Sequence, residues 1–256
     1  MEKDTVPKIL VLDIETLPNQ AFVWGCYDQN VLRYIQQSCI ATFSAKWLGE
    51  KKLISRALND YDGYRPGSYD DKELVTDLWK LVDEADIIIA HNGVGFDFKV
   101  CNARFIFNDL KPPRPYKTID TKLIFKSIAR YNTNKLDDLC QLLGLGQKIK
   151  TNFDLWVGCI NGDKKCWKDM VKYNEQDVLV LEKLYLKVLP WIKDHPNLTL
   201  WTGGICPKCG SREVQWRGYQ VTSTRVYRRF QCTSCAGWGR SVKCEKEPKA
   251  LTTNAI

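Results

Sequence analysis

The sequence has no apolar run long enough to cross a membrane, and its first residues lack the basic-then-apolar order of a secretory signal peptide. We therefore expect a cytoplasmic protein, of a bacterium or of a virus in its host's cytoplasm, that does not associate with membranes. Acidic residues are scarce in one region: residues 201–256 hold 3 Asp and Glu against 10 Lys and Arg, whereas residues 1–200 hold 27 against 28. A basic segment favours an anionic partner such as nucleic acid, although excess charge can also merely solvate a surface.

An apolar, β-branched stretch near the start, Ile9–Thr16, lies between Pro7 and Pro18 and predicts a buried central strand. Because side chains two apart share a strand face, Asp13 and Glu15 point the same way. Two adjacent carboxylates at a buried strand repel each other and lose hydration, so they stay ionised where cations such as Mg²⁺ or Mn²⁺ are bound. The alternative is an accidental, solvated pair of acids at a strand end.

The following segments predict more of an α/β fold. Residues 21–27, 39–48 and 53–58 are rich in aromatic and β-branched residues, and we expect them to complete an antiparallel edge of the sheet. Residues 70–85 carry leucines at helical spacing, and the buried strand 86–90 comes next. Because strand, helix and strand follow one another, a crossover connection and a parallel or mixed sheet are predicted.

That strand leads into a glycine-containing turn, after which Asp97 falls in the first turn of a predicted helix ending near residue 108. A carboxylate there could bind a metal or could only complement the helix dipole. Phe96 could stack on a base or lie in the core beneath the turn, and His91 is interpreted as structural. Asp120 precedes another helix, and we interpret it as an N-cap and not as a metal ligand.

The last long helical pattern covers residues 163–191. Within it Tyr173 and Asp177 are four residues apart, one turn from each other on one face. Asp177 lies beside an apolar stripe, so it is either paired at the helix edge or a metal ligand. An earlier stripe of leucines at 136, 139, 142 and 143 is expected to belong to the core.

Three acidic motifs are thus spread along the chain: Asp-Ile-Glu-Thr at 13–16, Asn-x-x-x-Phe-Asp at 92–97 and Tyr-x-x-x-Asp at 173–177. Together they are similar to the three motifs of the DEDD (DnaQ-like) 3′–5′ exonucleases. The tyrosine resembles the branch that includes the proofreading domain of family B DNA polymerases, because the histidine branch would have a His in place of Lys172. The resemblance covers about residues 8–190 and implies an RNase H-like fold, a mixed five-stranded sheet flanked by helices.

The resemblance also implies a site. Two Mg²⁺ or Mn²⁺ ions about 4 Å apart would be held by four carboxylates: Asp13, Glu15, Asp97 and Asp177. Tyr173 would orient the attacking water. Asn92, Thr16 and Leu17 resemble the residues that contact the terminal nucleotide. The implied activity releases nucleoside monophosphates from a 3′ end, and we expect single-stranded DNA because the resemblance points to polymerase proofreading domains.

The basic C-terminal region carries two Cys-x₂-Cys pairs, Cys206 with Cys209 and Cys232 with Cys235, separated by a 22-residue spacer. Two such pairs can close a tetrahedral four-thiolate Zn²⁺ site. Two disulfides are the alternative, and they would be unusual in a cytoplasmic protein. Residues 214–219 and 225–231 predict strands between the pairs, so the module resembles a zinc ribbon, a fold too small to form without its structural Zn²⁺.

Basic and aromatic residues alternate along these ribbon strands. The arginines that we expect to contact nucleic acid are Arg217, Arg225, Arg228 and Arg229. Aromatic side chains interleaved with them suit base stacking, although they could instead pack on the cysteine pairs while the arginines are solvated.

The predicted organisation is therefore an exonuclease domain at 1–198, a zinc ribbon at 199–245 that assists substrate binding, and a flexible tail at 246–256. The expected partners are a nucleic acid with a 3′ end and, beyond it, a replication or repair protein. Three alternatives remain open: a catalytically inactive nuclease fold that acts as a binding or recruitment module, an exonuclease that acts on RNA, and an endonuclease on the same fold.

Overall fold

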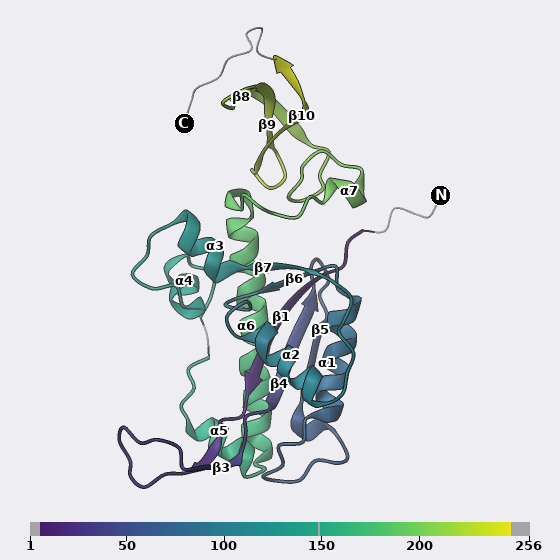
Figure 1. Cartoon of the computed structure of the whole chain (residues 1–256). Helices are drawn as coiled ribbons and strands as arrows, with labels where there is room; N and C mark the ends of the chain where they lie inside the picture. The colour runs from purple at the N-terminus through teal and green to yellow at the C-terminus, as the bar shows by residue number, and fades with distance from the viewer. Residues whose placement is uncertain (1–5, 148, 247–256) are drawn as a thin grey trace. The chain divides into compact units, whose positions relative to one another are not determined.

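The computed structural model describes residues 6–147 and 149–246 (Figure 1). The chain forms two compact units, which we call the N-terminal unit (Lys8–Tyr185) and the C-terminal unit (the described residues from Leu186 onward). Of the predicted tail at 246–256, only Lys246 is among the described residues, and it ends a strand. No helix in the described ranges is both long and apolar enough to span a membrane.

The N-terminal unit is built on a five-stranded sheet in the order β5-β4-β1-β6-β7. Its strands are β1 (Ile9–Thr16), β4 (Ile40–Trp47), β5 (Leu53–Ala57), β6 (Ile87–Ala90) and β7 (Lys117–Asp120). The central strand β1 runs parallel to β6 and antiparallel to β4, while β6 and β7 are parallel. The predicted mixed five-stranded sheet is confirmed, and the apolar runs that predicted it are the buried central strands.

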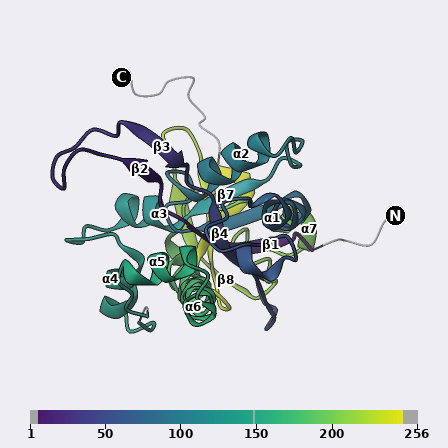
Figure 2. The ribbon, with the colours of Figure 1, turned by 90° about the horizontal axis from the view of Figure 1, so that it is seen from below.

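Helices cover both faces of this sheet. They are α1 (Lys72–Glu84), α2 (Asp97–Phe107), α3 (Thr121–Ile128), α4 (Leu136–Leu142), α5 (Asp154–Ile160) and α6 (Lys164–Val188), with a 3₁₀ turn η1 (Leu58–Asp60). The long helix α6 lies on one face, and α1 and α2 lie on the other (Figure 2). Fully buried Leu10 and Leu12 join the apolar cluster that contains the α1 residue Leu78. On the opposite face, a nearly buried ion pair between Lys46 and Glu182 fastens α6 to β4.

Two predictions about this unit are wrong. Residues 21–27 do not join the sheet, whose antiparallel edge is completed by β4 and β5 alone. Instead β2 (Gln20–Phe22) pairs with β3 (Arg33–Gln36) in a separate hairpin, which leaves Trp24 87% exposed. The leucine stripe of α4 is buried only in part: Leu142 is 63% exposed, since it lies about 120° around the helix from buried Leu136.

The C-terminal unit begins with the last turn of α6 and consists mainly of a three-stranded antiparallel sheet, ordered β10-β9-β8. Its elements are η2 (Leu189–Trp191), α7 (Thr199–Thr202), β8 (Val214–Val221), β9 (Val226–Cys232) and β10 (Trp238–Lys246). The first two strands were predicted, whereas β10 was not. Phe230 is buried at the centre of the sheet, and Gly239 faces it across the β9–β10 pair. A small β unit with four cysteines is the architecture of a zinc ribbon.

Candidate active site and cysteine cluster

Three of the predicted acidic residues meet in the N-terminal unit. Asp13 and Glu15 project from the same face of β1, and Asp177 comes from α6, which covers that face. One carboxylate oxygen from each residue lies within 4.8 Å of the others. Asp177 is almost completely buried, while Asp13 and Glu15 are partly exposed. The strand and the helix therefore bring together residues that are more than 160 positions apart in the sequence.

Asn174 orients one of these carboxylates, and it was missed in the sequence. Its Nδ2 donates a hydrogen bond of 2.6 Å to Asp13 Oδ2, and its Oδ1 accepts one of 3.4 Å from Thr42 Oγ1 on β4. The side chain is fully buried. Its position three residues before Asp177 was the available signal, because that spacing places both side chains on one helix face.

Asp97 lies beside the acidic strand. It is in the first turn of α2, as predicted, and is 2% exposed. The pairing of β1 with β6 ends at Val11, so the backbone of Ile14 is not paired with β6. Asp97 Oδ1 instead accepts a hydrogen bond of 3.4 Å from the Ile14 N–H. Asp97 is not in the group of three whose oxygens lie within 4.8 Å. Its role as a metal ligand stays a prediction, made from a position next to Asp13 and Glu15.

Tyr173 is held by an aromatic neighbour. Its ring meets that of Trp156, on α5, edge to face with the ring centroids 6.3 Å apart. The Trp156 Nε1–H donates to the Thr16 carbonyl at 3.1 Å, so one indole contacts both motifs. Thr16 and Trp156 also line a hollow of about 390 Å³. The expected contact of Leu17 with a nucleotide is wrong for its side chain, which is 1% exposed because it points into the core.

The turn after β6 is organised by Asp120. As predicted, Asp120 is the N-cap of α3, where its carboxylate accepts from the N–H groups of Lys122 and Leu123. It also accepts from the N–H groups of Asn92 and Val94, at 3.0 and 3.1 Å. Asn92 is thereby kept in the left-handed conformation, with φ of 72°. Its side-chain oxygen accepts from the Lys122 ammonium at 3.1 Å.

The two other candidates in this turn have different surroundings. Phe96 is 40% exposed, so its alternative interpretation as a core residue is wrong, whereas Phe98 is the buried aromatic residue of this segment. Both ring nitrogens of His91 are engaged, with Thr121 Oγ1 at 2.8 Å and the Asn134 carbonyl at 2.9 Å. These contacts agree with the structural role that we predicted for His91.

The chemistry of the acidic cluster suits a hard divalent cation. Carboxylate oxygens are the ligands that Mg²⁺ and Mn²⁺ prefer. Three carboxylates whose oxygens lie within 4.8 Å of one another repel each other when ionised, and a bound cation offsets that repulsion. The donors present therefore fit a divalent metal site, and RNase H-like nucleases use such metals.

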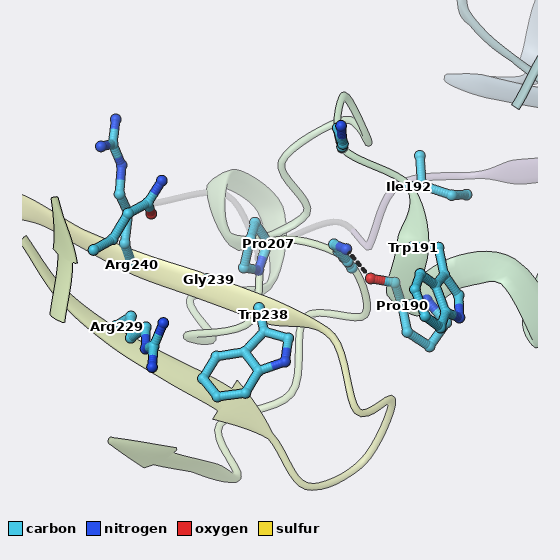
Figure 3. A pocket seen from close by; sticks show the side chains of 11 residues that line it. Pro190, Trp191, Ile192, Pro207, Arg229, Trp238, Gly239 and Arg240 are labelled. Atoms are coloured by element: carbon cyan, nitrogen blue, oxygen red, sulfur yellow. Dashed lines mark hydrogen bonds between the residues drawn. The ribbon is translucent and has the colours of Figure 1, made fainter. Parts of the chain in front are cut away.

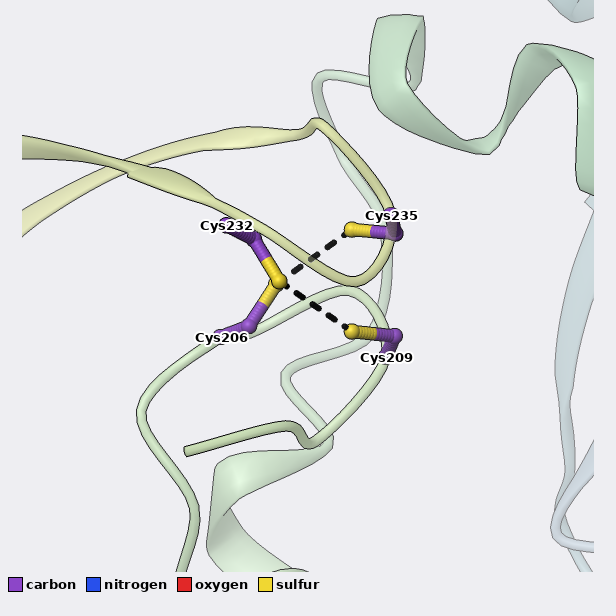
Figure 4. A group of neighbouring side chains, drawn as sticks. All are labelled: Cys206, Cys209, Cys232 and Cys235. Atoms are coloured by element: carbon purple, nitrogen blue, oxygen red, sulfur yellow. Dashed lines mark hydrogen bonds between the residues drawn. The ribbon is translucent and has the colours of Figure 1, made fainter. Parts of the chain in front are cut away.

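In the C-terminal unit the four predicted cysteines converge (Figure 4). Their Sγ atoms all lie within 4.8 Å of one another, with Cys206 and Cys209 at 3.6 Å from Cys235 and Cys232 respectively. Four sulfurs bound to one tetrahedral Zn²⁺ at 2.3 Å would be about 3.8 Å apart, so the spacing fits zinc. Such spacing is far too long for disulfides.

The local backbone brings the four thiols together and lowers the pKa of one of them. Gly210 and Ala236, each directly after a Cys-x₂-Cys pair, have positive φ of 72° and 61°, which curls the chain back around the sulfurs. Burial acts to raise the pKa of Cys232, but hydrogen bonds from the backbone N–H groups of Cys235 and Ser234, together with those from the Cys209 and Cys206 side chains, outweigh it and lower the pKa to about 7. A thiolate is thus accessible near neutral pH, as a metal ligand requires.

Two of the four ribbon arginines are stacked on aromatic rings. The Arg228 guanidinium lies 4.9 Å from the ring centroid of Trp216, and that of Arg229 lies 5.1 Å from Trp238. Arg217 instead donates to the side chains of Gln231 and Gln215 on the sheet surface. Arg225 lies in the β8–β9 turn, where its N–H donates to Thr222 Oγ1. The alternating basic and aromatic pattern therefore forms a structured surface.

Comparison with known proteins supports this picture. Among solved structures the chain is similar to the family B DNA polymerase of the hyperthermophilic archaeon Pyrobaculum calidifontis, with a TM-score of 0.54 and 15% identity. The match covers 76% of this chain and only 25% of the polymerase chain. A search of curated proteins gives no match. A family model described as the RNase H superfamily matches residues 10–189, which include all three acidic motifs. The chain therefore belongs to the RNase H superfamily.

Proposed function

We propose that the protein is a metal-dependent 3′–5′ exonuclease that hydrolyses phosphodiester bonds at the 3′ end of nucleic acid, with single-stranded DNA as its preferred substrate. The observation that carries the proposal is the convergence of Asp13, Glu15 and Asp177, with Asp97 and Tyr173 on the elements that adjoin them. Nuclease chemistry is what the superfamily and the polymerase likeness support. The direction of cleavage and the preference for DNA rest on the resemblance of the three motifs to those of the polymerase proofreading domains.

Asp13, Glu15, Asp97 and Asp177 would hold two Mg²⁺ or Mn²⁺ ions, which, when bound, polarise the phosphate and lower the pKa of a water molecule. Other residues of the chain position these carboxylates and the attacking water. Asn174 fixes the orientation of the Asp13 carboxylate through its 2.6 Å hydrogen bond. The Tyr173 hydroxyl can hydrogen-bond a water molecule and orient it, since its ring is fixed against Trp156.

Two further groups would bind the substrate. Thr16 borders the hollow under Trp156, and Asn92 and Phe96 are partly exposed at the turn after β6, where they can contact the last nucleotide. The C-terminal unit, with one structural Zn²⁺, would bind the strand through Arg217, Arg225, Arg228 and Arg229. Because both units belong to one chain, binding by one raises the local concentration of substrate at the other.

The test is cleavage of a single-stranded oligonucleotide that carries a fluorophore at its 5′ end, with Mg²⁺, Mn²⁺ or EDTA. We expect stepwise release of mononucleotides that stops with EDTA and with Asp13→Asn or Asp177→Asn, while Asp62→Asn, which changes an exposed carboxylate, cleaves normally. Circular dichroism checks that the variants fold. Undiminished cleavage by a pure Asp13→Asn protein would contradict the site assignment.

The same assay separates the other candidate functions. Cuts within a circular single strand would identify an endonuclease, and preferential digestion of a matched RNA would identify an RNA-directed enzyme. Binding without cleavage by the wild-type protein under every metal condition would favour an inactive fold that serves as a binding or recruitment module.

A further inference from the structure

A cavity of about 690 Å³ lies entirely within the C-terminal unit (Figure 3). Its walls come from the turn that follows α6, from the first cysteine pair and from strands β8, β9 and β10. A volume of this size falls in the range of about 300–1,000 Å³ that is usual for ligand pockets. Of the residues that line it, only Arg229 was predicted to contact nucleic acid, and the family match ends at residue 189.

The charged side chains that line the cavity are all basic: Lys193, Lys208, Arg229 and Arg240. Lys208 has a structural role, because its ammonium donates to the Pro190 carbonyl and thus fastens the turn after α6 to the cysteine pair. Arg229 donates from Nε to the Arg217 carbonyl at 2.8 Å, which leaves its two terminal nitrogens for an occupant. Lys193 and Arg240 are the other two cations that line the cavity. The absence of any carboxylate among the lining residues makes the cavity complementary to an anion.

Two tryptophans share the cavity with these cations. Trp191, in η2, is 67% exposed and Trp238, at the start of β10, is 45% exposed. The Arg229 guanidinium lies 5.1 Å from the Trp238 ring centroid, and that of Arg240 lies 4.0 Å from the Tyr227 centroid. Guanidinium groups that stack by their faces keep N–H groups at their edges for phosphate oxygens.

We propose that this cavity binds an unpaired nucleotide of a single-stranded nucleic acid, with its base against Trp191 or Trp238 and its phosphate at Arg229, Arg240 and Lys193. Indoles in a hollow can stack only on a base whose face is uncovered, and in a duplex the neighbouring pairs cover both faces. The proposal rests on the proposed function in one respect, since the bound strand would also be the substrate. An acidic peptide would neutralise the basic side chains, but its carboxylates would not stack on the two indole rings.

The experiment measures binding by the full chain, separately from cleavage. The Asp13→Asn protein is titrated against a fluorescein-labelled oligothymidylate and against a blunt duplex of equal length, and anisotropy gives Kd at several salt concentrations. The same measurement is made with Trp191→Ala, Trp238→Ala and Trp238→Phe added. The matched control is Trp24→Ala, which removes a more exposed tryptophan from the β2–β3 hairpin. Zinc content and circular dichroism verify that each variant retains its fold.

We expect at least one of Trp191→Ala and Trp238→Ala to weaken single-strand binding about five-fold or more, as the loss of one stacked base predicts. If Trp238→Ala weakens binding, Trp238→Phe should restore most of the loss. Trp24→Ala and all duplex affinities should change little. The proposal is overturned if folded Trp191→Ala and Trp238→Ala proteins both bind like the parent, if the duplex is bound as tightly as the single strand, or if polyglutamate competes as well as the oligonucleotide does.

The binding experiment tests the cavity independently of the proposed nuclease activity. If wild-type protein fails to cleave but the tryptophan variants lose single-strand affinity, the cavity assignment stands and the exonuclease assignment fails. If wild-type protein cleaves short oligonucleotides and the tryptophan variants bind normally, the exonuclease assignment stands and the cavity assignment fails.

Discussion

The two units of this chain hold their metal-binding groups in opposite ways. In the N-terminal unit the acidic cluster is set on a sheet with a large apolar core, in which residues such as Leu10 and Ile88 have no exposed surface. In the C-terminal unit seven of the eight residues of β8 are exposed and few apolar side chains are buried. There the four cysteines replace a core. A metal site can thus be carried by a fold or can itself hold the fold together.

The largest expected effect follows from removing the Zn²⁺ that we propose for the cysteine cluster. A structural Zn²⁺ contributes about 10–16 kcal/mol to folding of a small domain at neutral pH, so a strong chelator or Cys232→Ser should unfold the C-terminal unit and leave the N-terminal sheet intact. Hydrogen exchange followed by mass spectrometry would show loss of protection in β9 and retained protection in β1. Retained protection in β9 of the metal-free protein would break the comparison.

A reciprocal change is Asp71→Ala in the N-terminal unit. The buried Asp71 carboxylate accepts from the Arg104 guanidinium at 2.6 and 2.8 Å and from the Ile40 N–H at 2.9 Å. Its removal leaves a guanidinium without its counter-charge, which should cost about 3–5 kcal/mol of unfolding free energy in urea. Exposed Asp70→Ala is the control and should cost far less. Zinc content should not change in either variant.

A smaller effect is expected for Gly239→Ala in the ribbon. A Cβ at this position would approach the Phe230 ring to 2.3 Å, so the buried ring must move. Overpacking of this kind costs about 1–3 kcal/mol, which should appear as weaker zinc retention in a competition with a chromogenic chelator. Val242→Ala, at a residue that is 99% exposed in the same strand, should retain zinc normally. Equal zinc retention by the two variants would show that Phe230 does not limit the ribbon's stability.

Asn174→Ala tests whether a neighbouring side chain raises the affinity of the acidic cluster for its metal. Loss of the hydrogen bond to Asp13 should lower the affinity for Mg²⁺ or Mn²⁺ about 10–100-fold, because groups that orient metal ligands typically contribute that much. The readout is the metal concentration that gives half-maximal cleavage, with Gln176→Ala as the control on the same helix. An unchanged metal requirement would mean that the sheet alone orients Asp13.

The comparison also explains how much could be predicted. In the N-terminal unit, burial imposes hydrophobic patterns on the sequence, so strands such as Ile87–Ala90 could be predicted from their apolar runs. The β2–β3 hairpin and β10 are mostly exposed, so no hydrophobic pattern marks them. Residues 21–27 were therefore assigned to the wrong sheet, and β10 was not predicted. For the site, spacing identified the acids and the cysteines. It could not show that Leu17 turns inward or that Asn174 reaches Asp13, because both depend on how β1 meets its neighbours.

The β2–β3 hairpin leaves and re-enters the sheet at one point. Its ends are already joined, since the Leu17 N–H donates to the Cys39 carbonyl at 3.0 Å and Ser38 Oγ donates to the Leu17 carbonyl at 2.7 Å. Closing a loop across such a junction depends only weakly on loop length. The segment is thus a place where evolution can lengthen, shorten or exchange sequence a few residues from Glu15 without disturbing the strand that carries it.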